Sequence, residues 1–202
     1  RDDALAEVLG RSVRLLCESC RASADQAVAA AAAAKDGLSL GPAASSSPRG
    51  ARHVYLLNCF QGLSAALAKG SADNKAEVDA LARESLGALV DALFEGVAPV
   101  GKVVMEKIAA EVLPSSDELK DVLDTIHAAM LQWLQEEGGP SRAMPALAAL
   151  EAEALRQEAQ LKVLESLSQT YQQIYVTLVT HYPQVAIQHK PEYIQDLCKA
   201  LT

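Results

Sequence analysis

PALAALEAEALRQEAQLKVLESLSQTYQQIYVTLVTH, residues 145–181, is the longest stretch of the chain that has no glycine or proline inside it. Its large apolar residues recur at multiples of three and four, which places them on one side of a helix. That side comprises Leu161, Leu164, Leu167, Tyr171, Ile174, Tyr175, Leu178 and, just beyond the stretch, Tyr182. The opposite side carries Glu158, Lys162, Glu165, Gln169, Gln172 and Gln173. The pattern predicts one long helix whose apolar side packs against partner helices.

The N-terminal part of the chain supplies such partners. A first helix is predicted to follow Asp2 and Asp3 and to continue through the alanines at 27–34. Its buried side is expected to comprise Leu5, Val8, Leu9, Leu16 and Cys20. Residues 35–50 are rich in Gly, Pro and Ser and are interpreted as a flexible linker or insertion. A second helix is predicted over 51–69, ending at Gly70, with an apolar side of Leu56, Phe60, Leu63 and Leu67.

Helix start and stop signals continue along the middle of the chain. Ser71 or Asp73 is expected to cap a third helix, whose apolar residues are Val78, Leu81, Leu89, Leu93 and Val97. The Gly and Pro residues within 96–101 predict a break, followed by a shorter helix over 102–112. The sequence SSDE at 115–118 has the form of a capping box and predicts a new helix that ends at the GGP of 138–140. Its apolar side is expected to be Leu119, Val122, Leu123, Ile126, Met130, Trp133 and Leu134.

The C-terminus is expected to close the fold with a short helix. Pro183 ends the long helix, an extended connector follows, and Pro191 suits the first turn of a last helix. Its apolar residues are Ile194, Leu197, Cys198 and Leu201. No alternating pattern predicts a strand. We therefore expect an all-α fold, an elongated antiparallel helical bundle or rod of six to seven helices that forms a single module over 1–202.

Composition limits the function classes. Half of the residues are hydrophobic but only 4% are aromatic, so the core is expected to be built from Ala, Leu and Val. A formal net charge of −8 and the absence of a basic cluster argue against nucleic acid and anionic lipid as partners. No apolar window is long enough to predict a transmembrane span. Arg1 stands where an initiator Met would stand and no signal peptide follows, so we expect a fragment whose N-terminal part is missing.

The cysteines offer one candidate chemical motif. Cys17 and Cys20 form a CxxC, which in a thioredoxin-like enzyme follows a strand and begins a helix. Here it lies deep inside a helical run, and Cys59 and Cys198 are too isolated to complete a zinc site. Packed thiols in a reducing compartment are the favoured interpretation, and a small thiol-dependent enzyme is the alternative.

Other residue types give no catalytic pattern. His53, His127, His181 and His189 form no metal-binding pair in sequence, and for His127 a solvated helix surface is favoured over a contact with Asp121 or Asp124. Glu136–Glu137 and Asp117–Glu118 are interpreted as helix-end charges. The tyrosines of the long helix are assigned to core packing rather than to a binding stripe. No catalytic, cofactor-binding or metal-binding residue is therefore predicted, and no enzymatic activity.

Four stretches together resemble the C-terminal part of the sixth subunit of the conserved oligomeric Golgi complex. The first is 9–22, with two leucines and a cysteine at Leu15, Leu16 and Cys17. The second is VYLLNCF at 54–60, and the third is ESLGALVD at 84–91. The fourth is 165–175, which ends in YQQIY and is followed by an extended segment, Pro191 and a closing helix. The chain departs from the family at 27–50, which has the character of an insertion, at the short connector 138–146, and at Lys190, where Ser or Thr would cap the last helix.

The resemblance implies a non-enzymatic subunit of a vesicle-tethering complex. Such a subunit acts in intra-Golgi retrograde transport, is peripheral to the cytosolic face of the Golgi membrane, and scaffolds other subunits. SNARE proteins, Rab GTPases and coat components would be its further partners, through grooves that accept amphipathic helices. A scaffold or adaptor of another rod-like tethering complex is the alternative. Neither the resemblance nor the helical period indicates which residues would contact partners.

Overall fold

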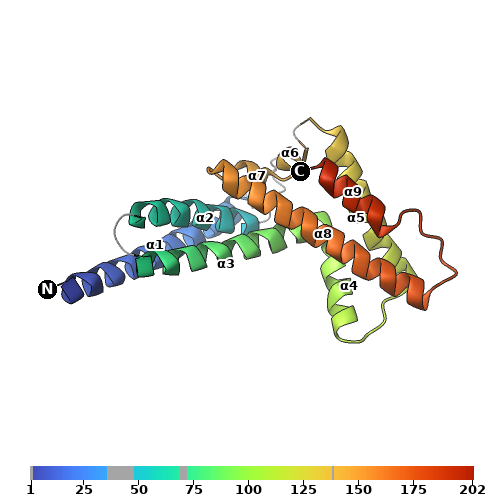
Figure 1. The fold of residues 1–202 in the computed structure, drawn as a ribbon, viewed down its shortest axis with the longest axis horizontal. Coiled ribbons are helices and arrows are strands. Elements are labelled where there is room, and N and C mark those ends of the chain that lie inside the picture. The colour runs from blue at the N-terminus through green and yellow to red at the C-terminus, as the bar shows by residue number, and fades with distance from the viewer. Residues whose placement is uncertain (1, 36–47, 69–71, 138) are drawn as a thin grey trace. The chain divides into compact units, whose positions relative to one another are not determined.

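A computed structural model describes residues 2–35, 48–68, 72–137 and 139–202. Within these ranges the secondary structure is entirely helical, which confirms the predicted all-α class. The helices are α1 (Asp2–Lys35), α2 (Pro48–Leu67), α3 (Ala72–Val97), α4 (Pro99–Ala109), α5 (Ser116–Gln135), α6 (Gly139–Ala143), α7 (Pro145–Ala148), α8 (Glu153–His181) and α9 (Pro191–Ala200), shown in Figure 1. The expected linker at 35–50 and the expected stop and cap at Gly70 and Ser71 fall mostly or wholly outside the described residues.

The chain divides into two compact units. Unit 1 comprises Arg1–Leu89 with Ala149–Glu153, and unit 2 comprises Val90–Ala148 with Ala154–Thr202. The division falls inside α3, at the end of α7 and after the first residue of α8, so no Gly- or Pro-rich linker marks it. The sequence predicts a single module over these residues and gives no sign of the division.

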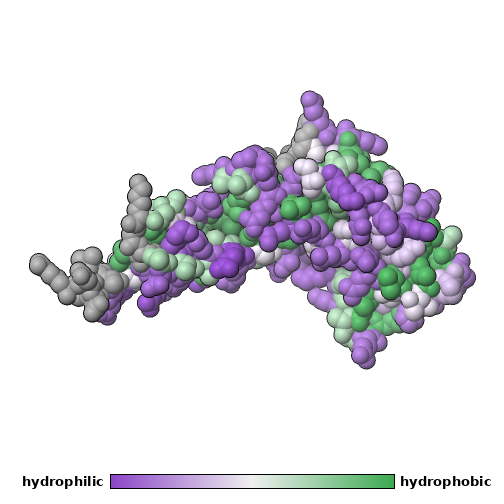
Figure 2. All heavy atoms as spheres, viewed as in Figure 1, coloured by the Kyte–Doolittle hydropathy of each residue, from purple (hydrophilic) through white to green (hydrophobic). Residues whose placement is uncertain are grey.

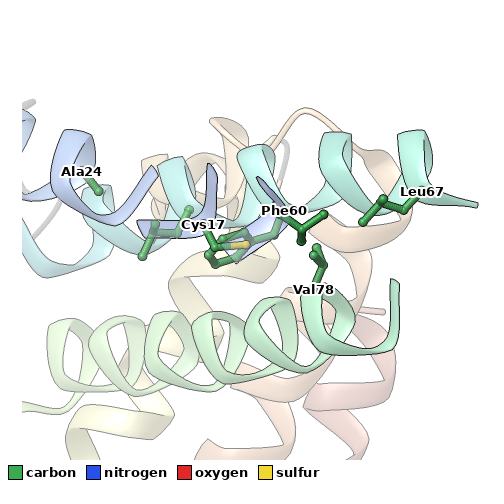
Figure 3. Packing of buried hydrophobic residues seen from close by; sticks show 7 residues of the cluster. Cys17, Ala24, Phe60, Leu67 and Val78 are labelled. Carbon is green, nitrogen blue, oxygen red and sulfur yellow. The ribbon is translucent and has the colours of Figure 1, made fainter. Parts of the chain in front are cut away.

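Unit 1 is built on α1, α2 and the first part of α3. Its core cluster joins Val13, Cys17 and Ala24 of α1 to Phe60 of α2 and Val78 of α3, with the further members Leu56 and Leu67 (Figure 3). Arg52 of α2 forms an ion pair with Asp25 of α1 at 2.6 Å.

The buried side of α1 differs from the predicted one. Val8 and Leu16, both expected in the core, are 66% and 52% exposed, and the buried residues are instead Gly10, Val13, Cys17 and Ala24. These residues are separated by three, four and seven positions, a spacing typical of the side of a helix that packs against a partner helix. A Cβ added at Gly10 would lie 3.3 Å from Asn74 Oδ1 of α3, so the Asn74 side chain would have to shift slightly to admit a larger residue. The residues of α1 that pack in the unit 1 core are therefore smaller than the leucines that stay exposed.

The long helix predicted over 145–181 is interrupted. Residues 149–152 are not helical, and α8 begins at Glu153. Asn58 of α2 holds this break, because its amide nitrogen donates to Ala149 O at 3.1 Å and its oxygen accepts from the Glu151 N–H at 3.1 Å. Leu150, between these two residues, is fully buried. The expectation of one continuous helix is wrong because a tertiary hydrogen-bond pair competes with the local helical preference.

Unit 2 confirms several local signals. Ser115 is the N-cap of α5, and Ser115 and Glu118 form the predicted capping box. The break before α4 falls at Ala98, although α4 begins at Pro99 rather than 102 and ends at Ala109 rather than 112. The short helices α6 and α7 replace the expected connector and raise the number of helices in the described residues from the predicted six or seven to nine.

The apolar sides of α5, α8 and α9 are largely the predicted ones. On α5, six of the seven expected residues are buried and Leu134 is 40% exposed. On α8 the polar side is exposed as expected, but Leu161 is also exposed, whereas Val163, Ala159 and Leu155 are buried. α9 begins at Pro191 and buries Ile194 and Leu197, with Leu201 buried just after its end.

Candidate interaction surfaces and polar clusters

Helix α1 presents a line of large apolar side chains to solvent. Val8, Leu15 and Leu16 are 66%, 59% and 52% exposed. Val8 and Leu15 are seven residues apart and lie almost in line along the helix. Leu16 is eight residues after Val8, about 80° from it around the axis, so the three lie on one broad side of the helix, which we call the α1 apolar face. A single exposed leucine needs no explanation, but three on one face are typical of a surface that contacts a partner.

A second apolar surface lies on unit 2. Val100 and Val103 of α4, and Val112 and Leu113 in the segment after it, are exposed. Figure 2 shows hydrophobic residues at the surface around α4. Glu111, which precedes Val112, has a positive φ of 57°, and the Val112 N–H donates to Lys107 O. The chain turn after α4 thus displays Val112 and Leu113 outward.

The CxxC thiols are packed rather than paired with each other. Cys17 is buried in the unit 1 core, where burial raises its pKa, with the nearby Glu77 adding to the effect. Cys20 is half-buried, and burial and a hydrogen bond with the Cys59 thiol of α2 raise its pKa to about 11. Raised values disfavour the thiolate that a redox or metal site uses. Cys198 donates to Leu164 O at 3.6 Å, and its pKa is also raised by burial. The described residues include no group of three or more His, Cys, Asp or Glu placed to hold a metal ion.

Two of the four histidines meet in unit 2. The rings of His127 on α5 and His189 in the connector before α9 have centroids 4.1 Å apart, and Tyr193 of α9 stacks on His189 at 4.6 Å. The two histidines border a cavity of about 390 Å³ whose lining includes Lys120, Asp124 and Tyr171. His127 is half-buried, contrary to the solvated position expected from the sequence. No local signal could have revealed the pair, because its members come from distant segments.

The acidic pairs and the tyrosines have structural roles. Glu118 accepts hydrogen bonds from Lys107 and from the Ser115 backbone, and both lower the pKa of its carboxyl group. Glu136, next to the end of α5, accepts from Gln132 Nε2 at 2.6 Å. Tyr171 is buried and its hydroxyl donates to His189 O, and the Tyr182 hydroxyl donates to Pro114 O. These tyrosines therefore fasten the C-terminal segments instead of forming an exposed stripe.

None of the described helices combines the length and the hydropathy that crossing a membrane requires. Comparisons of the chain with protein-family models, with curated proteins and with solved structures gave no match.

Proposed function

We propose that this chain is a non-catalytic helical module of a multisubunit tether at the cytosolic face of the Golgi membrane. It would act in intra-Golgi retrograde transport by holding other subunits of the conserved oligomeric Golgi complex, with SNARE proteins, Rab GTPases and coat components as further partners. The order of segments that resembles the sixth subunit supports the proposal, as does the helical architecture.

One structural observation carries the proposal. Leu15 and Leu16 belong to the stretch that contributes to the family resemblance, and both point to solvent instead of into the unit 1 core. Because they are exposed, these two leucines contribute little to the unit 1 core. A partner helix packed on the α1 apolar face would bury them. Helices commonly bind one another in this way, through apolar anchors on one face.

The test is copurification of the tagged chain from a Golgi-enriched extract. The parent chain is expected to recover the other subunits of the conserved oligomeric Golgi complex, and a Leu15→Asp, Leu16→Asp double variant is expected to lose them. Both side chains are exposed, so each substitution should change the free energy of unfolding by no more than about 0.5 kcal/mol, and the pair by no more than about 1 kcal/mol. Leu161→Asp, which changes a leucine that is 45% exposed on α8, is the matched control and should retain the subunits.

Three results would contradict the proposal or a part of it. Recovery of no tethering subunit by the parent chain would remove the functional assignment. Recovery of a different rod-like tethering complex would instead support the alternative scaffold function. If the double variant folds and still recovers the subunits as well as the parent does, the α1 apolar face is not the contact surface.

A further inference from the structure

The last segment of unit 2 is fastened at a cluster of three aromatic rings. His127 of α5, His189 of the connector and Tyr193 of α9 make mutual ring contacts, with centroid separations of 4.1, 4.6 and 5.8 Å. We call these three residues the histidine clamp. They join the connector and the start of α9 to α5, and the Tyr171 hydroxyl of α8 donates a hydrogen bond to His189 O at 2.9 Å.

The clamp favours an uncharged His127. Its Nε2 atom is shielded from solvent and has no hydrogen-bond partner among the described residues. Protonation of this atom would therefore create a positive charge that neither water nor a protein group solvates. Burial is the main cause that lowers the pKa of His127, and the neighbouring His189 adds to it.

Charged groups from each neighbouring element also bear on the clamp. Asp124 on α5 opposes the shift because its carboxylate attracts the protonated ring, but the net direction is downward. Lys120 of α5 lines the same cavity. α8 contributes Tyr171, whose pKa is raised to about 12 by burial and by Asp124, so it stays neutral. The connector and α9 contribute His189 and Tyr193.

We propose that the histidine clamp is a pH-sensitive latch, in which protonation of His127 releases the connector and α9 from α5. Protonation of His127 would place a positive charge against the His189 ring, whose centroid is 4.1 Å away, with no hydrogen-bond partner at Nε2. The ring contacts then weaken, and α9 keeps only the packing of its buried Ile194 and Leu197 and two hydrogen bonds with α8, from Cys198 to Leu164 O and from Gln160 to Leu201 O. α9 has only 10 residues, too few to remain helical in water without that packing.

The sign of the pH dependence follows from linkage. In the open state the imidazole of His127 has its ordinary pKa of about 6.5, and in the closed state its pKa is lower. The open state therefore binds more protons, so closure is fully favoured above about pH 6.5 and is lost progressively as the pH falls through the lowered value. For each unit of difference between the two pKa values, the equilibrium constant for opening rises about tenfold at low pH.

Hydrogen exchange of the whole chain tests the latch. Exchange of the α9 amides, corrected for the intrinsic effect of pH, is compared at about pH 7.5 and about pH 5.5, which bracket the ordinary histidine pKa. We expect faster corrected exchange in α9 at the lower pH, while the α5 amides near Ile126 stay protected. His127→Phe keeps a ring against His189 but cannot be protonated, so its α9 exchange should be independent of pH. His181→Gln, which changes an exposed histidine at the end of α8, should behave as the parent.

Asp124→Asn tests whether the charge on His127 controls α9 release, because a purely structural role of His127 would not make that release depend on the pKa of its ring. Because Asp124 favours the protonated ring, its neutralisation should lower the pKa of His127 further and move α9 release to lower pH. Nuclear magnetic resonance titration of the His127 ring in the parent chain measures that pKa directly. If His127→Phe does not fold, His189→Phe, which removes the imidazole that helps to lower the pKa of His127, should raise that pKa. The proposal is overturned if the parent shows no change in α9 exchange, if His127→Phe keeps the pH dependence, or if His127 titrates at or above the ordinary value.

Discussion

Replacement of Asn58 by alanine tests whether a tertiary contact, rather than the local sequence, ends the helical run before α8. The Asn58 side chain donates to Ala149 O and accepts from the Glu151 N–H, each at 3.1 Å. Alanine removes both bonds but leaves helix α2 intact, since alanine is the best helix former. The change therefore acts on the segment 149–152 and on its attachment to α2.

The magnitude follows from the two hydrogen bonds. Each contributes about 0.5–1.5 kcal/mol net to stability. Ala149 and Glu151 are exposed, so water can satisfy their backbone groups after the change, which places the expected loss in the lower part of the range, at about 1–2 kcal/mol. For a chain of this size the melting temperature should fall by about 2–8 °C.

Thermal unfolding followed by circular dichroism measures this loss, and hydrogen exchange measures its location. The amide of Glu151 should lose protection in Asn58→Ala. Gln61→Ala, at an exposed position one turn further along α2, is the matched control and should change stability by less than about 0.5 kcal/mol. If Asn58→Ala melts as the control does and Glu151 stays protected, the break does not depend on Asn58 and our explanation of it is refuted.

Two further predictions concern a pair of glycines and the CxxC thiols. Gly101→Val should destabilise the chain by about 1–3 kcal/mol through overpacking, because a Cβ there lies 3.3 Å from Phe94 Cζ. Gly87→Ala, in an exposed helical position with open space around it, should instead stabilise by about 0.5–1 kcal/mol, and urea unfolding of both variants would contradict us if the two signs agree. Cys17 and Cys20 should alkylate slowly at neutral pH in the folded chain and rapidly after unfolding, because their raised pKa values keep them as thiols. Rapid alkylation of either thiol in the folded chain, followed by mass spectrometry, would favour the thiol-dependent enzyme.

The features that the sequence predicts well are those with a local cause. Ser115 and Glu118 lie within one turn, so their capping box can be recognised without knowledge of the rest of the fold. Pro99 and Pro191 lack the N–H that a helix interior needs, and each begins a helix. The polar side of α8 is likewise determined by its own residues, because charged and amide side chains remain exposed whichever partners cover the other side.

The features that the sequence does not predict depend on contacts between distant segments. Asn58 meets residues 149–151 only after the chain has folded, and the Ala- and Leu-rich sequence around them contains no helix breaker. The pair of His127 and His189 has the same origin, and neither residue has a neighbour in sequence that indicates the other. The division inside α3 is invisible for a related reason: one continuous helix contributes to both units, so no change of composition accompanies it.

The α1 apolar face shows why hydrophobicity alone misassigns a helix face. Helix α1 carries apolar residues on more than one side, and the largest of them would be expected to be buried in the core. Yet the side of α1 that packs against the unit 1 core carries Gly10, Val13, Cys17 and Ala24, which are smaller than leucine. The large residues Val8, Leu15 and Leu16 are consequently left on the outer face. The same packing constraint that specifies the core of unit 1 thus creates the surface on which our proposed partner contact depends.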